Sequence, residues 1–128
     1  MEKITITKHE VTLNIITGCS RKEYMQHIVD QLGPTEWTDD VKVGEEDSID
    51  GTYSHTTIGN FFMKKHYHFI WLKDPKNLKV LAHELAHFMF RIMVLRKVKV
   101  EKIVSKEDWA LFMGDFMDEA ESLIRRNR

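Results

Sequence analysis

The sequence predicts a small α+β domain with an antiparallel or mixed sheet. Segments rich in Ile, Thr and Val, with partial alternation of polar and apolar residues, are typical of half-buried strands. Other segments place apolar residues at helical spacing after residues that commonly start helices. The order strand, helix, two strands, helix, helix favours an α+β fold over alternating β–α units. A chain of 128 residues fits one compact domain, which we expect to span residues 1–128.

The N-terminal part is expected to contain one or two strands and a helix. Residues 3–16 alternate in part and favour strand. Ser20 and Glu23 have the spacing of a capping box, in which each side chain bonds the backbone of the other residue. We therefore expect a helix that starts at Ser20 and stops at Gly33, followed by a solvated acidic loop over residues 34–50.

Two strands and a connecting loop are expected in the middle of the chain. Residues 51–58 and residues 67–73 have the composition of strands, and the second segment is apolar enough to be buried or half-buried. The loop between them should include Lys64 and Lys65.

Two helices are expected in the C-terminal part. Asp74 followed by proline is a common helix start, and the apolar spacing carries this helix to about Leu95. Ser105 should open a last helix that continues to about Arg125. Residues 97–102 are basic and rich in valine, which is compatible with a strand or an extended link.

Composition and charge narrow the partners and the compartment. The formal net charge of −1 gives no general field for polyanions, so we expect no nucleic-acid partner. Cys19 is the only cysteine, which excludes an internal disulfide and is compatible with a reducing compartment. The N-terminus lacks the apolar core of a secretory signal, and no run approaches the ~20 apolar residues that span a bilayer. We therefore expect a cytoplasmic protein without a membrane partner.

A zinc motif lies within the helix expected over residues 74–95. His83 and His87 are four residues apart, so both imidazoles lie on one face of a helix, one turn apart. Two neutral imidazoles at this spacing can bind one zinc ion. Glu84 follows His83 at about 100° around the helix axis, where it can act as general base for a water that zinc activates. The apolar stripe of this helix points the opposite way, so the histidines do not belong to the core.

A catalytic zinc needs three protein ligands and an open position. No histidine follows His87, so the third ligand must be a carboxylate, the cysteine or an upstream histidine. Glu107 is the first choice, because it lies twenty residues later, in the first turn of a helix that can fold back beside the zinc helix. Asp108 is the main alternative. The remaining candidates are Glu101, Asp115 and Cys19.

The segments around the motif resemble a known family. A Phe-Ile-Trp strand, the helix with His83 and His87, and a later helix with Glu107 and an aromatic-rich turn are similar to small zinc metallopeptidases encoded by tailed bacteriophages. The similarity extends over about residues 51–118, and the ligand set resembles that of the gluzincins. The chain departs from the pattern at Asp108, where a small residue is expected.

This resemblance implies a zincin-like fold, a Zn²⁺ cofactor and a peptide or protein substrate. It also implies a phage or prophage origin, with the host cytoplasm as the compartment. By the same resemblance, the strand at Tyr67–Leu72 should pair with extended substrate through its backbone. We expect His55 or Tyr67 to donate a hydrogen bond to the tetrahedral oxyanion. Other rings in the region are Tyr53, His66 and His68.

The predicted function is a zinc-dependent hydrolase, specifically a metallopeptidase. His83, His87 and Glu107 would hold the zinc, and Glu84 would act as general base and then pass the proton to the leaving amine. One alternative is a phage-encoded binding or inhibitory protein that keeps this fold with a structural or vestigial metal. Another is a motif that arose by chance and binds no metal. The sequence specifies neither the substrate nor the oligomeric state.

Overall fold

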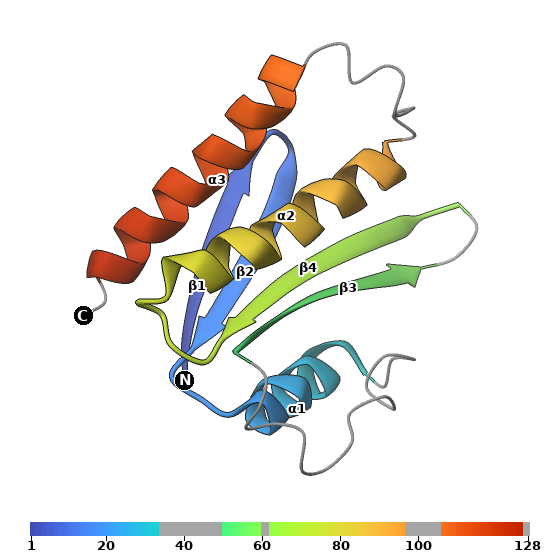
Figure 1. The fold of residues 1–128 in the computed structure, drawn as a ribbon. Coiled ribbons are helices and arrows are strands. Elements are labelled where there is room, and N and C mark those ends of the chain that lie inside the picture. Colours follow the sequence, from blue (N-terminus) through green and yellow to red (C-terminus); the bar gives the residue numbers. More distant parts are fainter. Residues whose placement is uncertain (34–49, 60–61, 97–105, 127–128) are drawn as a thin grey trace.

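The computed structural model describes residues 1–33, 50–59, 62–96 and 106–126, without the side chains of residues 106–108. These residues form a four-stranded mixed sheet with helices on both faces (Figure 1). The elements in chain order are β1 (Glu2–Lys8), β2 (Val11–Thr17), α1 (Arg21–Leu32), β3 (Gly51–Gly59), β4 (Lys64–Leu72), α2 (Leu78–Leu95) and α3 (Lys106–Arg126). The predicted α+β class is confirmed, and of the two predicted sheet types, antiparallel or mixed, the structure has the mixed one.

The strands lie in the order β1-β2-β4-β3, which leaves β1 and β3 at the edges. β1 pairs antiparallel with β2, β2 pairs parallel with β4, and β4 pairs antiparallel with β3. α2 and α3 cover one face of the sheet, and α1 covers the other (Figure 1). No helix in the described ranges is both long and apolar enough to cross a bilayer.

Two hydrophobic cores hold these layers together. The larger core lies between the sheet and the helices α2 and α3, and the smaller one lies between the sheet and α1. Leu81, Leu85, Phe88 and Ile92 of α2 are buried in the larger core, as the apolar stripe predicts. Leu78, the first residue of α2 and of the stripe, is 40% exposed.

The connection between β1 and β2 is a two-residue turn at His9 and Glu10. Both residues have positive φ (53° and 64°), as in a type I′ turn. Arg96, just after α2, donates from Nη2 to the His9 carbonyl over 2.6 Å. The His9 ring Nε2 lies 2.8 Å from the Asp115 carboxylate of α3. The turn is therefore fastened to both helices of that layer.

The predicted capping box of α1 is confirmed. Ser20 Oγ accepts a hydrogen bond from the Glu23 backbone N–H over 3.1 Å, and the Glu23 carboxylate accepts one from the Ser20 N–H over 3.2 Å. The helix ends at Leu32, where Gly33 takes a positive φ of 86° and donates to the Val29 carbonyl over 2.8 Å. The start of α1 therefore follows from side-chain capping, and its end follows from a glycine that can take positive φ.

The predicted starts of β4 and α2 are wrong by a few residues. Lys64 and Lys65 belong to β4 rather than to a loop, because they pair with Gly59 and Ile58 across the hairpin. Pairing with a neighbouring strand outweighs the weak strand preference of lysine.

Asp74 accepts a hydrogen bond from the Lys76 N–H over 2.9 Å and forms a turn instead of a helix cap. Asn77 caps α2, with its side-chain oxygen accepting from the Val80 N–H over 3.2 Å. The predicted end of this helix at Leu95 is confirmed. The predictions for residues 34–49 and 97–102, and for Ser105 as a helix start, lie outside the described residues.

Candidate metal centre

α2 presents His83 and His87 side by side on its exposed face. Their Nε2 atoms are 3.2 Å apart, and their ring centroids are 4.8 Å apart at an interplanar angle of 77°. Two ligands of a tetrahedral zinc, each at about 2.0–2.1 Å, are about 3.3 Å apart. The two imidazoles therefore already have the separation that a shared zinc ion requires.

Glu84 lies beside this pair but is buried, with 7% of its surface exposed. Burial raises the pKa of its carboxyl group above the ordinary range. Nearby His83 and His87, and a hydrogen bond from the Tyr53 backbone N–H, lower the pKa and offset only part of this effect. The carboxyl group is thus held between the histidine pair and the edge strand β3.

A close approach of α2 to β3 creates this arrangement. A β-carbon at Gly51 would lie 2.5 Å from Cγ1 of Val80, so only glycine fits without displacement. Asp50 and Gly51 of the β3 end, with residues of the first two turns of α2, line a cavity of about 370 Å³. Both His83 and Glu84 line it, so a small group could reach the motif from solvent.

The structure does not describe the side chain of the third ligand predicted from the sequence. Glu107 and Asp108 belong to α3, but their side chains lie outside the described residues, as does Glu101. Among the side chains that the structure describes, no group of three or more His, Cys, Asp or Glu is placed to hold a metal ion. α3 packs against the Phe88 side of α2 through Phe112 and Phe116.

Two further candidate ligands lie elsewhere in the fold. The carboxylate of Asp115 is engaged with His9 at the β1–β2 turn. Cys19 packs against the smaller core, on the α1 side of the sheet, and its carbonyl accepts a hydrogen bond from Trp71 over 3.0 Å. The structure does not bring either residue together with the histidine pair.

A cluster of aromatic and imidazole rings occupies the α2 face of the β3–β4 hairpin. His55 Nε2 lies 3.0 Å from His66 Nδ1, and the His55 ring stacks on His68 with centroids 5.0 Å apart. The Tyr53 hydroxyl lies 2.8 Å from His68 Nδ1. Burial lowers the pKa of His68 to about 3 and that of His55 to about 4, with the neighbouring rings and Arg91 adding to both effects. Both imidazoles are therefore neutral at neutral pH.

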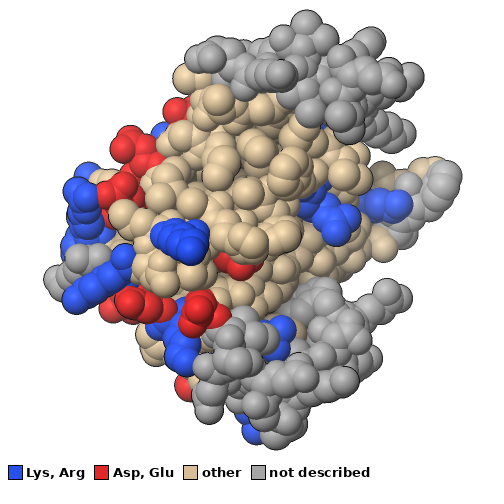
Figure 2. All heavy atoms as spheres, in the orientation of Figure 1, with Lys and Arg blue, Asp and Glu red and all other residues tan. Residues whose placement is uncertain are grey.

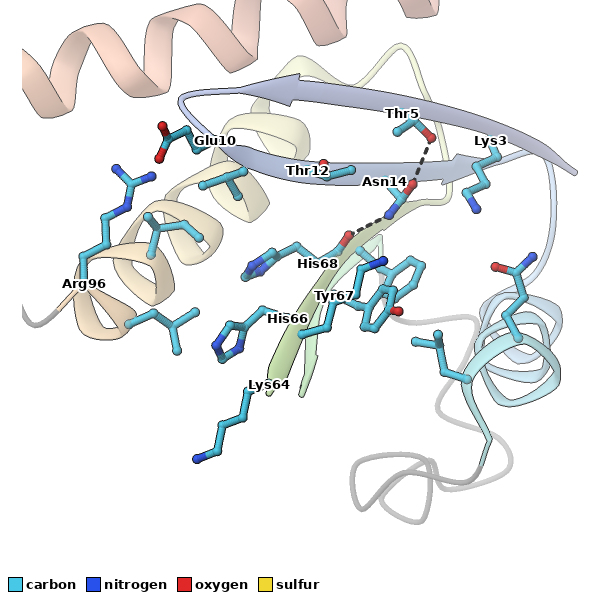
Figure 3. Close-up of a pocket in the computed structure, with 17 residues that line it drawn as sticks. Lys3, Thr5, Glu10, Thr12, Asn14, Lys64, His66, Tyr67, His68 and Arg96 are labelled. Carbon is cyan, nitrogen blue, oxygen red and sulfur yellow. Dashed lines mark hydrogen bonds between the residues drawn. The ribbon is translucent and has the colours of Figure 1, made fainter. Parts of the chain in front are cut away.

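The two predicted oxyanion donors lie on opposite faces of the sheet. His55 faces α2, on the same side as Glu84. Tyr67 packs beside the smaller core on the α1 side, so the structure does not bring it together with the motif. Figure 3 shows His66 and His68 projecting to one side of β4 and Tyr67 to the other.

The prediction that the strand at Tyr67–Leu72 pairs with substrate is wrong. β4 lies between β2 and β3, and residues 68–71 pair with both neighbours. β3 is the edge strand beside α2. The sequence indicated two adjacent strands but did not reveal which of them would be covered by the parallel strand β2.

Other residues beside the motif were missed in the sequence. Asp50 and Gly51 line the His83 cavity but follow an acidic run that reads as loop. Arg91 could have been found from the sequence, because it lies four residues after His87 and therefore on the same face of the helix. Figure 2 shows that, among described residues on the α2 face, charged side chains of both signs gather over the C-terminal part of α3.

Comparison of the chain with known protein families, curated proteins and solved structures finds no match.

Proposed function

We propose that this protein is a zinc-dependent hydrolase that cleaves peptide bonds, on a zincin-like arrangement of sheet and helix. The observation that supports it most is the pair of Nε2 atoms of His83 and His87, 3.2 Å apart, with the buried Glu84 carboxyl group next to them. In this proposal the two histidines bind zinc, and Glu107 remains the predicted third ligand. A bound zinc ion would supply Lewis-acid chemistry, polarising the attacking water and the scissile carbonyl group.

Glu84 is the general base of the proposed reaction. Its carboxylate accepts a proton from the attacking water and then donates that proton to the leaving amine. Burial raises the pKa of this group, which strengthens the carboxylate as a base. The Tyr53 N–H holds the carboxylate at the edge of β3, where an extended substrate would lie.

The edge of β3 beside α2 is the proposed substrate platform. β3 is hydrogen-bonded to β4 along one side, and no other strand within the described residues pairs with its second side. In this proposal an extended peptide pairs there with backbone groups other than the Tyr53 N–H, which donates to Glu84. His55 is the proposed oxyanion donor, because its neutral ring lies on the α2 face. Tyr67 has no part in this proposal, because it lies on the other face of the sheet.

The proposal is tested by metal analysis and by the variant Glu84→Gln. Purified protein should contain about one zinc per chain, and anomalous scattering at the zinc edge should place the ion between His83 and His87. Glu84→Gln should keep the zinc and lose hydrolysis of a peptide library, because Gln cannot accept the proton. A variant that cleaves as well as the parent would remove Glu84 as the base. A protein that binds zinc but cleaves no peptide would favour the binding or inhibitory alternative.

A further inference from the structure

A second cavity lies along the edge of β3, beyond the candidate metal centre. This cavity has a volume of about 330 Å³ and is lined by residues 52–55 of β3, by Arg21 and Met25 of α1, and by Arg91 of α2. Since α1 and α2 cover opposite faces of the sheet, the cavity wraps around the edge of β3 that no other described strand pairs with. A ligand in it would touch the β3 backbone and both helices.

The described lining of the cavity is positively charged. It contains two guanidinium groups and no carboxylate. Arg21 is held at the cavity by a hydrogen bond from its Nε to the Thr52 hydroxyl over 3.2 Å, a bond that does not use its two terminal nitrogens. Neither arginine forms an ion pair with a carboxylate in the part of the chain that the structure describes. Arginine in such a setting binds carboxylates with charge-assisted hydrogen bonds.

The cavity adjoins the reacting groups along both β3 and α2. Tyr53 lines the cavity, and its backbone N–H donates to Glu84. Arg91 lies one helical turn beyond His87 on the same face of α2. If an extended peptide pairs with β3 and one of its groups binds between the two arginines, a peptide bond a few residues away along the same peptide would lie next to Glu84.

We propose that this cavity is a substrate subsite for a carboxylate, carried by an acidic side chain or by the C-terminus of a peptide paired with β3. The inference rests on the proposed peptidase function for the identity of its ligand. Thr52 and Ser54 add hydroxyl groups, and the neutral ring of His55 adds hydrogen bonding without charge. The charge of the pocket, as described, comes from Arg21 and Arg91.

Peptide binding to the Glu84→Gln protein tests the subsite without cleavage. The probes are an acetylated, amidated alanine-rich peptide with one central glutamate, the same peptide with glutamine, and the glutamine peptide with a free C-terminus. We expect the glutamate peptide, the free C-terminal peptide, or both to bind at least about tenfold more tightly than the neutral one, as a charged hydrogen bond allows. Which of the two gains affinity assigns the source of the carboxylate.

The arginine variants decide whether the preference comes from this cavity. Arg91→Gln and Arg21→Gln, each in the Glu84→Gln background, should remove most of the preference. Lys22→Gln should retain it, because it removes a positive charge from an exposed neighbour of Arg21 that does not line the cavity. Arg91 is exposed on α2, so we expect Arg91→Gln to fold. That variant alone tests the inference if Arg21→Gln does not fold.

Equal binding of all three peptides, or a preference that survives in both arginine variants, would overturn the inference. Zinc content and hydrolysis are measured separately on the parent protein. Zinc binding and cleavage without a charge preference would defeat the subsite alone. An arginine-dependent preference in a protein without zinc would defeat the peptidase proposal and leave the carboxylate site standing.

Discussion

A β-carbon at Gly51 would lie 3.3 Å from Cγ of Glu84, the proposed general base. It would also lie 3.2 Å from the Trp71 carbonyl oxygen and 2.5 Å from Cγ1 of Val80. The missing side chain at the start of β3 therefore sets how closely α2 approaches the sheet. The same contact holds the Glu84 carboxyl group within reach of the Tyr53 N–H.

Gly51→Ala should destabilise the protein and lower its activity. The added methyl group must push Val80 or Glu84 aside, and overpacking of this kind costs about 1–3 kcal/mol. Gly114→Ala is the matched control, because a β-carbon there meets no heavy atom within 4 Å and alanine in a helix interior gains about 0.5–1 kcal/mol over glycine. Urea unfolding of both variants measures the difference. A Gly51 variant as stable as the Gly114 variant would show that α2 does not depend on this close approach.

Removing zinc should lower the melting temperature. A ligand that binds only the folded state stabilises it by about 2.7 kcal/mol at a hundred times its dissociation constant. His83→Gln and His87→Gln should melt at the same temperature with and without chelator, because each loses one of the two paired nitrogens. Thermal unfolding with added zinc and with chelator checks this expectation. A parent protein that is indifferent to both additions would support the reading of the motif as chance.

The local features of the fold could be predicted from the sequence. Ser20 and Glu23 form their capping box within one helical turn, and the helix end at Gly33 needs only a glycine that can take positive φ. The outward direction of His83 and His87 follows from helical periodicity alone. These features depend on residues that are close in sequence, so their physics is readable without tertiary structure.

The features that depend on distant partners could not be predicted. Lys64 becomes strand because Gly59 pairs with it, and β4 becomes central because β2 joins it in parallel. Tyr67 and His68 are adjacent in sequence, yet strand alternation sends them to opposite faces. Knowing which face α2 would cover was necessary to separate these two residues as site candidates.

The third zinc ligand can be identified by comparing Glu107→Gln with Asp50→Asn. Glu107 is the sequence-based choice, whereas Asp50 lines the same cavity as His83 and Glu84. We expect Glu107→Gln to weaken zinc binding at least about tenfold, because a zinc site loses a charged ligand, and Asp50→Asn to leave it unchanged. Competition with a chromogenic zinc chelator measures both affinities. The reverse order would transfer the ligand role to Asp50.

Acid should destabilise the protein through His68. Its pKa is about 3 in the folded chain, whereas an unfolded histidine has a pKa of about 6.5. Between these values the unfolded chain binds a proton that the folded chain does not, so stability rises with pH in this window and is lost as pH falls from about 6.5 towards 3. One such proton gives a slope of at most about 1.4 kcal/mol per pH unit. His55, with a pKa of about 4, acts in the same direction. His68→Gln stays neutral throughout, so its stability, measured by urea unfolding in metal-free buffer, should fall less steeply between pH 6.5 and pH 4, and an offset that is the same at every pH would rule out this explanation.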